Sequence, residues 1–133
     1  MLTIKDFSIS IKNKNILKKV SLNIESNSIL GLVGESGSGK SITSLSIMGL
    51  LPKKNVTTEG LIEFNGTNIL SYDEKDFLII RGNQISMIFQ EPMTSLNPSL
   101  TCGFQVFEVF KNHTTLSAAE IKNEIISLFE KVK

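Results

Sequence analysis

The chain has little of what several protein classes depend on. Among its 133 residues are one cysteine, Cys102, one histidine, His113, and no tryptophan. A lone cysteine forms no intrachain disulfide, which fits a reducing cytoplasm. One cysteine and one histidine also exclude a recognisable zinc site. Nothing in the sequence fixes the two side chains together as a catalytic thiol and its base, so a structural role is favoured for both.

The sequence also lacks an excess of charge of one sign and has no long apolar run. The 14 basic and 13 acidic residues leave a net charge of +1, which argues against nucleic acid as a partner. The longest apolar runs are far shorter than the ~20 residues of a membrane span. Met1–Asp6 reaches an acidic residue too early for a signal peptide. A chain of this length predicts one domain or part of one.

Glycine, in contrast, is concentrated in one place. Residues 34–41 read Gly-Glu-Ser-Gly-Ser-Gly-Lys-Ser, which fits G-x-x-x-x-G-K-[ST], the Walker A phosphate loop, without a mismatch. Its glycines allow tight turns and a close approach to a ligand, and its N–H groups converge on an anion. Lys40 is expected to meet the β- and γ-phosphates, and Ser41 to coordinate Mg²⁺. Ordinary residue frequencies give such a match in about half a percent of chains this long.

The residues on either side predict the structural context that this motif needs. Ile29–Val33 is apolar almost throughout, which predicts a short parallel strand buried on both faces. Residues 42–51 predict a helix with Leu45 and Met48 on its apolar face, stopped by Pro52. The alternative is a glycine- and serine-rich surface turn that binds nothing, and the order strand, loop, helix argues against it.

The rest of the chain predicts an antiparallel β region, a second buried strand and terminal helices. Residues 2–11, 20–24 and 60–64 predict strands, and Asn65-Gly66 predicts a tight turn. Residues 85–89 predict a buried strand that ends at Gln90, and a short helix is expected through 77–80. Ser117 and Glu120 form a capping box, followed by one apolar stripe made of Ile121, Ile125, Leu128, Phe129 and Val132.

Together with Walker A, the stretch from Arg81 to Pro98 makes the chain resemble ATP-binding cassette (ABC) proteins. That stretch contains Phe-Gln-Glu-Pro at 89–92 and Ser-Leu-Asn-Pro at 95–98. The chain is most similar to the ATPase subunits of bacterial oligopeptide, dipeptide and nickel importers, which residues 31–41 and 46–52 match closely. The resemblance implies an α/β P-loop NTPase fold with an N-terminal antiparallel β subdomain, an incomplete core sheet and a C-terminal helical segment. It divides the domain into a β region (1–28), strand–loop–helix (29–52), β region with the glutamine loop (53–98) and helical start (99–133).

The same resemblance assigns site residues. Ser41 and Gln90 are expected to contact Mg²⁺, and Gln90 to help place the attacking water, since an amide offers a carbonyl and an N–H donor. Ile11 stands near the position of an aromatic that stacks on adenine in the family, and it has no π-face. Asn27 replaces a usual glycine, tolerably, because Asn also visits left-handed conformations. The nucleotide-binding set is Gly34, Glu35, Ser36, Gly37, Ser38, Gly39, Lys40, Ser41, Ile42 and Ile11.

Partners and location also follow from the resemblance. The loop from Glu91 to Thr101 is similar to the segment that contacts the coupling helices of a membrane permease. A second ATPase subunit is expected as the other half of a dimer. The chain is then expected in the cytoplasm, peripheral on the inner face of the cell membrane.

Three family motifs do not occur in the sequence: the Leu-Ser-Gly-Gly signature, the Asp-Glu of Walker B, and the switch histidine. His113 lies before the position where the signature would begin, so it is not the switch histidine. Without the Walker B pair, hydrolysis lacks its base, so this chain is expected to be inactive alone. It looks like the front half of an importer ATPase subunit, truncated by a frameshift, a premature stop or a split gene. Ile29–Val33 is then expected to lack strand partners on at least one edge.

Two alternatives are weighed against this reading. The first is a different P-loop enzyme, such as a GTPase or a small-molecule kinase. A GTPase would carry Asn-Lys-x-Asp, but residues 13–16 read Asn-Lys-Asn-Ile, lack the Asp and precede the loop. An interaction module would dock on the permease or on a full-length ATPase through Glu91–Thr101, without turnover. The sequence does not choose among oligopeptides, dipeptides, nickel or another solute.

Overall fold

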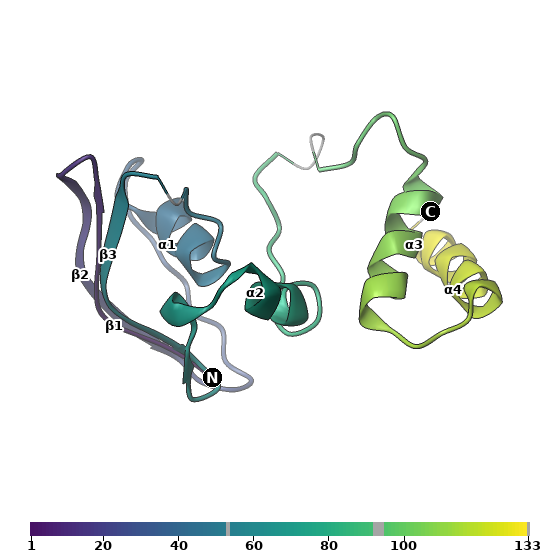
Figure 1. Ribbon diagram of the computed structural model, residues 1–133, viewed down its shortest axis with the longest axis horizontal. Coiled ribbons are helices and arrows are strands. Elements are labelled where there is room, and N and C mark those ends of the chain that lie inside the picture. Colours follow the sequence, from purple (N-terminus) through teal and green to yellow (C-terminus); the bar gives the residue numbers. More distant parts are fainter. Residues whose placement is uncertain (53, 92–94, 133) are drawn as a thin grey trace. The chain divides into compact units, whose positions relative to one another are not determined.

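The computed structural model describes residues 1–52, 54–91 and 95–132. The chain divides into two compact units, Met1–Ile79 and Ile80–Lys133, and each is described by itself (Figure 1).

The first unit is built on an antiparallel sheet. Its strands are β1 (Leu2–Ile11), β2 (Lys14–Ile24), β3 (Val56–Phe64) and β4 (Thr67–Asn68), in the order β2-β1-β3-β4. Both residues of the β1–β2 turn, Lys12 and Asn13, have positive φ, which matches the twist of a two-residue hairpin. The predicted strands at 2–11, 20–24 and 60–64 and the turn at 65–66 are confirmed.

A bulge in β1 decides which side chains form the core of this unit. Ile4, Phe7 and Ile9 are buried together with Ile62 of β3. Strict alternation would not place residues 4, 7 and 9 on one face, but the pairing shifts register between Ile4 and Phe7, where Asp6 has a φ of 47°. An extra residue at a bulge moves the following side chains to the opposite face, so the apolar pattern is kept.

Gly60 makes this bulge possible from the neighbouring strand. A Cβ built on Gly60 would lie 2.5 Å from the carbonyl oxygen of Asp6, and its φ is +93°. The Asp6 N–H is bonded instead by the hydroxyl of Ser21, at 2.9 Å. A serine hydroxyl thus replaces a ladder bond that the bulge removes.

Two strand predictions are wrong. Residues 29–33 lie within the described part of the chain and form no strand, and Ile29 and Val33 are 100% and 92% exposed. Residues 85–89 form no strand either, apart from an isolated bridge between Arg81 and Ile85. The physical reason is the same for both. A strand buried on both faces gains its stability from neighbours on each side, and the described residues supply none.

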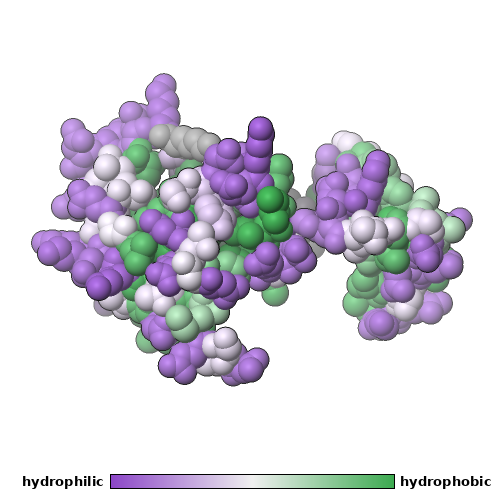
Figure 2. All heavy atoms as spheres, turned by 60° about the horizontal axis from the view of Figure 1, so that its bottom comes forward, coloured by the Kyte–Doolittle hydropathy of each residue, from purple (hydrophilic) through white to green (hydrophobic). Residues whose placement is uncertain are grey.

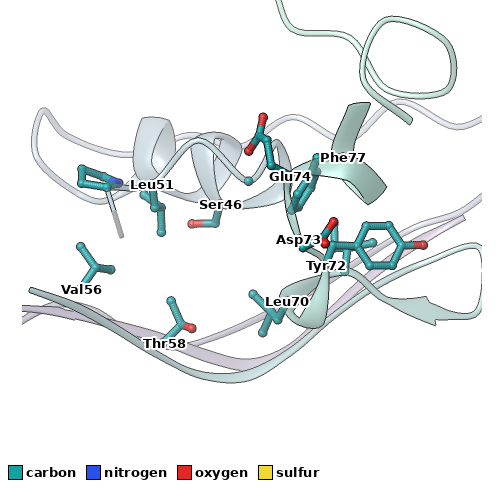
Figure 3. A pocket seen from close by; sticks show the side chains of 12 residues that line it. Ser46, Leu51, Val56, Thr58, Leu70, Tyr72, Asp73, Glu74 and Phe77 are labelled. Atoms are coloured by element: carbon teal, nitrogen blue, oxygen red, sulfur yellow. The ribbon is translucent and has the colours of Figure 1, made fainter. Parts of the chain in front are cut away.

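The 3₁₀ turn η1 (Ile69–Ser71) and helix α2 (Glu74–Ile80) follow β4 in the chain, and helix α1 (Lys40–Ile47) covers the sheet of the first unit. The buried residues of α1 are Thr43 and Ser46. Figure 3 shows Ser46 between α1 and the strand that carries Thr58. The hydroxyls of the two buried α1 residues donate back to the carbonyls of Gly39 and Ile42, at 2.8 and 2.6 Å. Of the predicted apolar face, Met48 is buried and Leu45 is half-buried.

The helix also stops earlier than predicted. Gly49, with a φ of 63°, donates to the carbonyl of Ser46, and Leu50 donates to that of Leu45. This pair of bonds is the Schellman motif, which ends a helix at a left-handed glycine. Pro52 therefore follows a helix that Gly49 has already ended.

A cavity lies between α1, β3, η1 and α2 in the first unit (Figure 3). Its volume of about 190 Å³ is below the roughly 300–1,000 Å³ of ligand pockets. We therefore treat it as a packing gap.

The second unit holds α3 (Cys102–His113) and α4 (Ala118–Lys131). Thr101 caps α3 through its hydroxyl, and the predicted capping box of Ser117 and Glu120 at α4 is confirmed. Only the first part of the predicted apolar stripe is packed: Ile121 and Ile125 are buried, whereas Val132 is 73% exposed. Apolar side chains reach the surface of both units, drawn in green in Figure 2.

Candidate functional site

The candidate site is the glycine loop between the extended segment at 29–33 and helix α1. Within it the N–H of Ser38 donates to the carbonyl of Glu35, at 3.2 Å, which closes a turn. Gly37 and Gly39 have φ values of 82° and 96°. Side chains with a Cβ rarely adopt this conformation, so the motif's glycines are required by the path of the backbone.

Two of these glycines are also fixed by what lies against them. A Cβ on Gly34 would come within 2.8 Å of the Ser38 hydroxyl oxygen. A Cβ on Gly39 would lie 2.5 Å from a methyl carbon of Leu17, a buried residue of β2. The end of the loop therefore rests directly on the sheet, and the sheet sets where α1 begins.

The ammonium group of Lys40 lies inside the loop. Its Nζ donates to the carbonyl oxygens of Gly34, at 2.6 Å, and Glu35, at 2.7 Å, and lies 3.3 Å from the Ser38 hydroxyl. An ammonium group has three donors and no acceptor, so these three oxygens use its full hydrogen-bonding capacity. The positive charge is held where the loop curls around it.

The N-terminus of α1 adds further attraction for an anion. Among the described residues, no side chain caps this helix and none in its first turn is acidic. Its first N–H groups therefore keep their donors for a ligand, and the helix dipole adds partial positive charge there. Ser41, in the first turn, is exposed. Glycines that a Cβ would crowd, an uncapped helix start and an inward ammonium fit a nucleotide's phosphates.

The other two predicted site residues belong to other elements of the chain. Ile11 ends β1, half-buried, and pairs with Lys14 and Val56. Gln90 belongs to the second unit, where its exposed side chain lines a shallow pocket with Phe89, Glu91 and Ser95. The first unit thus brings residues 34–42 together, while Gln90 stands in a different unit.

The described residues show neither a clustered metal site nor a membrane-spanning helix. They contain no group of three or more His, Cys, Asp or Glu side chains that could hold a metal ion. None of their helices has both the length and the apolar character that crossing a bilayer demands.

Sequence reasoning missed two features of this region. One is the contact between Gly39 and Leu17, and the other is the buried pair Thr43 and Ser46. The signal was the spacing of small residues at 39, 43 and 46, which share one helix face. Small side chains on one face allow a helix to lie close to a sheet.

Comparison with known proteins identifies what this chain is similar to. A family model described as "ABC transporter" matches residues 17–133. The oligopeptide transport ATP-binding protein AppD of Bacillus subtilis is 46% identical over 85% of this chain and 35% of its own length. The dipeptide transport ATP-binding protein DppD of Lactococcus lactis is 42% identical, over 87% of this chain and 34% of its own length.

One solved structure, described as the ATP-binding subunit of an ABC transporter, has a TM-score of 0.49 and 19% identity, covering 95% of this chain and 60% of that one. The chain spans about a third of the length of the curated relatives it matches.

Proposed function

Because the chain belongs to the ABC transporter family, we propose that it carries the phosphate-binding part of the ATP-binding subunit of a peptide importer. The observation that carries this proposal is the loop at 34–41, which combines left-handed glycines, an ammonium group held within the loop and a helix start with no side-chain cap. The relatives' names supply the solute class, since they refer to oligopeptide and dipeptide transport.

The proposed ligand is the triphosphate of ATP with Mg²⁺. Phosphate oxygens would accept from the N–H groups of Gly37 and residues 39–42, and from the ammonium of Lys40, which would exchange its carbonyl partners for them. The Ser41 hydroxyl would join the metal's ligands, as hard cations prefer oxygen donors. Gln90 would complete the metal shell, and Ile11 would contact the base through its apolar side chain.

The isolated chain is proposed to bind nucleotide without turning it over. Hydrolysis needs a carboxylate that polarises the attacking water, and the Walker B pair that the family uses for this does not occur in this sequence. A second ATPase subunit would supply the opposing half of a closed site. The permease would be contacted by the loop Glu91–Thr101, of which residues 92–94 lie outside the described residues, with the chain peripheral on the inner face of the membrane.

A second candidate function is docking without turnover on the permease or on a full-length ATPase subunit. It is favoured by the ordered turn at Asn97–Leu100, described below. Titration of an ATP analogue into the purified chain, beside a pull-down with the permease, separates the two, because only the first function requires nucleotide binding. Permease binding without nucleotide binding would support docking alone.

The site is tested by titrating a fluorescent ATP analogue into the chain and into Lys40→Ala. Hydrogen bonds to charged groups contribute about 1.5–3 kcal/mol, so we expect affinity to fall at least tenfold. Lys18→Ala, an exposed lysine of β2, is the matched control and should bind as the wild type does. Unchanged affinity in Lys40→Ala would defeat the site, and turnover by the isolated chain that Lys40→Ala abolishes would defeat the claim of inactivity.

A further inference from the structure

One side chain of α3 makes an unusual number of bonds to the segment before the helix. The Oε1 of Gln105 accepts from the N–H of Asn97, at 2.8 Å. Its Nε2 donates to the carbonyl of Asn97, at 3.1 Å, and to that of Leu100, at 3.2 Å. One amide group therefore bonds both backbone polar groups of one residue and the carbonyl at the far end of its turn.

The orientation of this amide is fixed by its partners. The N–H of Asn97 can only donate, and the carbonyls of Asn97 and Leu100 can only accept. Exchanging the amide's oxygen and nitrogen would set donor against donor and acceptor against acceptor. The bonds of the Gln105 amide to Asn97 and Leu100 all require the same orientation, so rotating the amide by 180° would remove all of them.

The segment that Gln105 holds is a compact turn. The N–H of Leu100 donates to the carbonyl of Asn97, at 3.1 Å, and the N–H of Ser99 donates to the Asn97 side-chain oxygen, at 2.9 Å. Pro98 sits at the second position, where its fixed φ suits a turn and its missing N–H costs nothing. The turn exposes Leu96 and Leu100, which are 50% and 41% exposed.

The place of Gln105 in the helix explains its reach. It lies one turn after the cap residue Thr101, and its own N–H donates to the Thr101 carbonyl. Helical side chains lean toward the N-terminus of their helix, which directs this amide at the turn that precedes α3. Because Gln105 is half-buried, water competes less for its bonds.

We propose that Gln105 is a positioning residue that fixes the Asn97–Leu100 turn on α3 and so presents this turn of the permease-contacting loop in one conformation. The inference rests on the proposed function, because that function gives the loop its partner. Gln105 does not touch nucleotide in this assignment. It acts through the turn.

The test compares the full chain with Gln105→Leu and Gln105→Glu. Leucine keeps size and helix propensity and removes every bond, while glutamate keeps an acceptor for the Asn97 N–H and loses both donors. Each lost bond corresponds to about a two- to tenfold change. We expect hydrogen exchange at the Asn97 amide to speed up about tenfold in Gln105→Leu and at least as much in Gln105→Glu, because the second carboxylate oxygen would set acceptor against acceptor at the two carbonyls.

The functional readout is affinity for an oligopeptide permease reconstituted in lipid nanodiscs. We expect a loss of about tenfold in Gln105→Leu and a loss at least as large in Gln105→Glu, with nucleotide affinity unchanged in both. Gln84→Leu, the same change at an exposed turn residue of this unit, is the control and should alter neither readout. Protection of the α4 amides verifies folding.

The outcomes separate the inference from the function beneath it. Unchanged exchange at Asn97 in a folded Gln105→Leu chain overturns the positioning role. Faster exchange with unchanged permease affinity overturns the link between turn and partner. A wild-type chain that binds nucleotide but not the permease overturns the proposed partner, and with it the functional half of the inference, whereas the exchange result still decides whether Gln105 holds the turn.

Discussion

Two apolar segments of equal length follow each other in the first unit and end differently. Val20–Ile24 alternates apolar and polar residues and pairs with β1, with Val20 opposite Phe7 and Leu22 opposite Ile4. Ile29–Val33 is more apolar, yet it forms no strand and leaves Ile29 and Val33 in solvent. The difference shows that apolar content alone does not make a strand. A hairpin neighbour does, and the second segment has none among the described residues.

The largest expected difference between the paired and unpaired segments is the loss of unfolding free energy when one side chain of each is truncated. Phe7 is fully buried in β1 and Val33 is 92% exposed. Phe7→Ala should lower the free energy of unfolding by about 3–5 kcal/mol, through lost burial and a cavity. Val33→Ala should change it by less than about 0.5 kcal/mol. Urea unfolding followed by circular dichroism measures both. A Val33→Ala cost near that of Phe7→Ala would mean that the segment is packed in solution.

Glycine offers a second, smaller contrast between the paired and unpaired regions. Gly60→Ala places a methyl group against the Asp6 carbonyl at a φ of +93°, so we expect a loss of about 1–3 kcal/mol in unfolding free energy. Gly31 lies in the unpaired segment, and no described atom lies within 4 Å of its built Cβ. Gly31→Ala should be neutral or stabilise slightly, by less than about 1 kcal/mol. Equal costs in thermal unfolding would contradict the comparison.

The smallest effect concerns the N-terminal ends of the helices. The first N–H groups of α4 are capped by a nearby side chain, whereas those of α1 have no side-chain cap. The Ser117 hydroxyl, and then its backbone N–H, donate to the Glu120 carboxylate and keep the pKa of Glu120 below its ordinary value. A lowered folded-state pKa gives stability that is present above the unfolded pKa and is lost as pH falls through the folded one. Helical signal from α4 should therefore decrease slightly below about pH 4.

Glu120→Gln is the control for this titration, because it keeps an acceptor and removes the ionisable group. Its helical signal should not vary with pH in that range. Loss of signal in Glu120→Gln at the same pH would assign the effect to another group. Amide exchange at Ser117 gives an independent measure, since its N–H is one of the donors.

The parts of the fold that the sequence predicted are those whose stability is local. The β1–β2 hairpin, the Asn65-Gly66 turn and the α4 capping box depend on neighbours a few residues away, and the pattern of those residues was enough. The strands at 29–33 and 85–89 were predicted from apolar content. They failed because their stability depends on distant partners that no local pattern reports.

The candidate site shows the same division. The glycine spacing predicted the loop, and the left-handed Gly37 and Gly39 give the physical reason for it. The spacing did not reveal that Lys40 bonds the carbonyls of its own loop, nor that Gln105 bonds the turn at Asn97. These contacts depend on side-chain reach across a folded backbone, which motif spacing does not encode. The roles of Ile11 and Gln90 stay predictions.

The contact between Leu17 and Gly39 gives the protein a native probe of its own loop. A leucine methyl group that touches a backbone glycine senses small displacements of that glycine as a change in its NMR frequency. Loading of the proposed phosphate site could thus be followed from a hydrophobic strand, with no dye attached and no change to the residues proposed to contact the ligand. Leu17→Val would shorten the side chain and should reduce the response of this methyl group's NMR frequency to movement of Gly39.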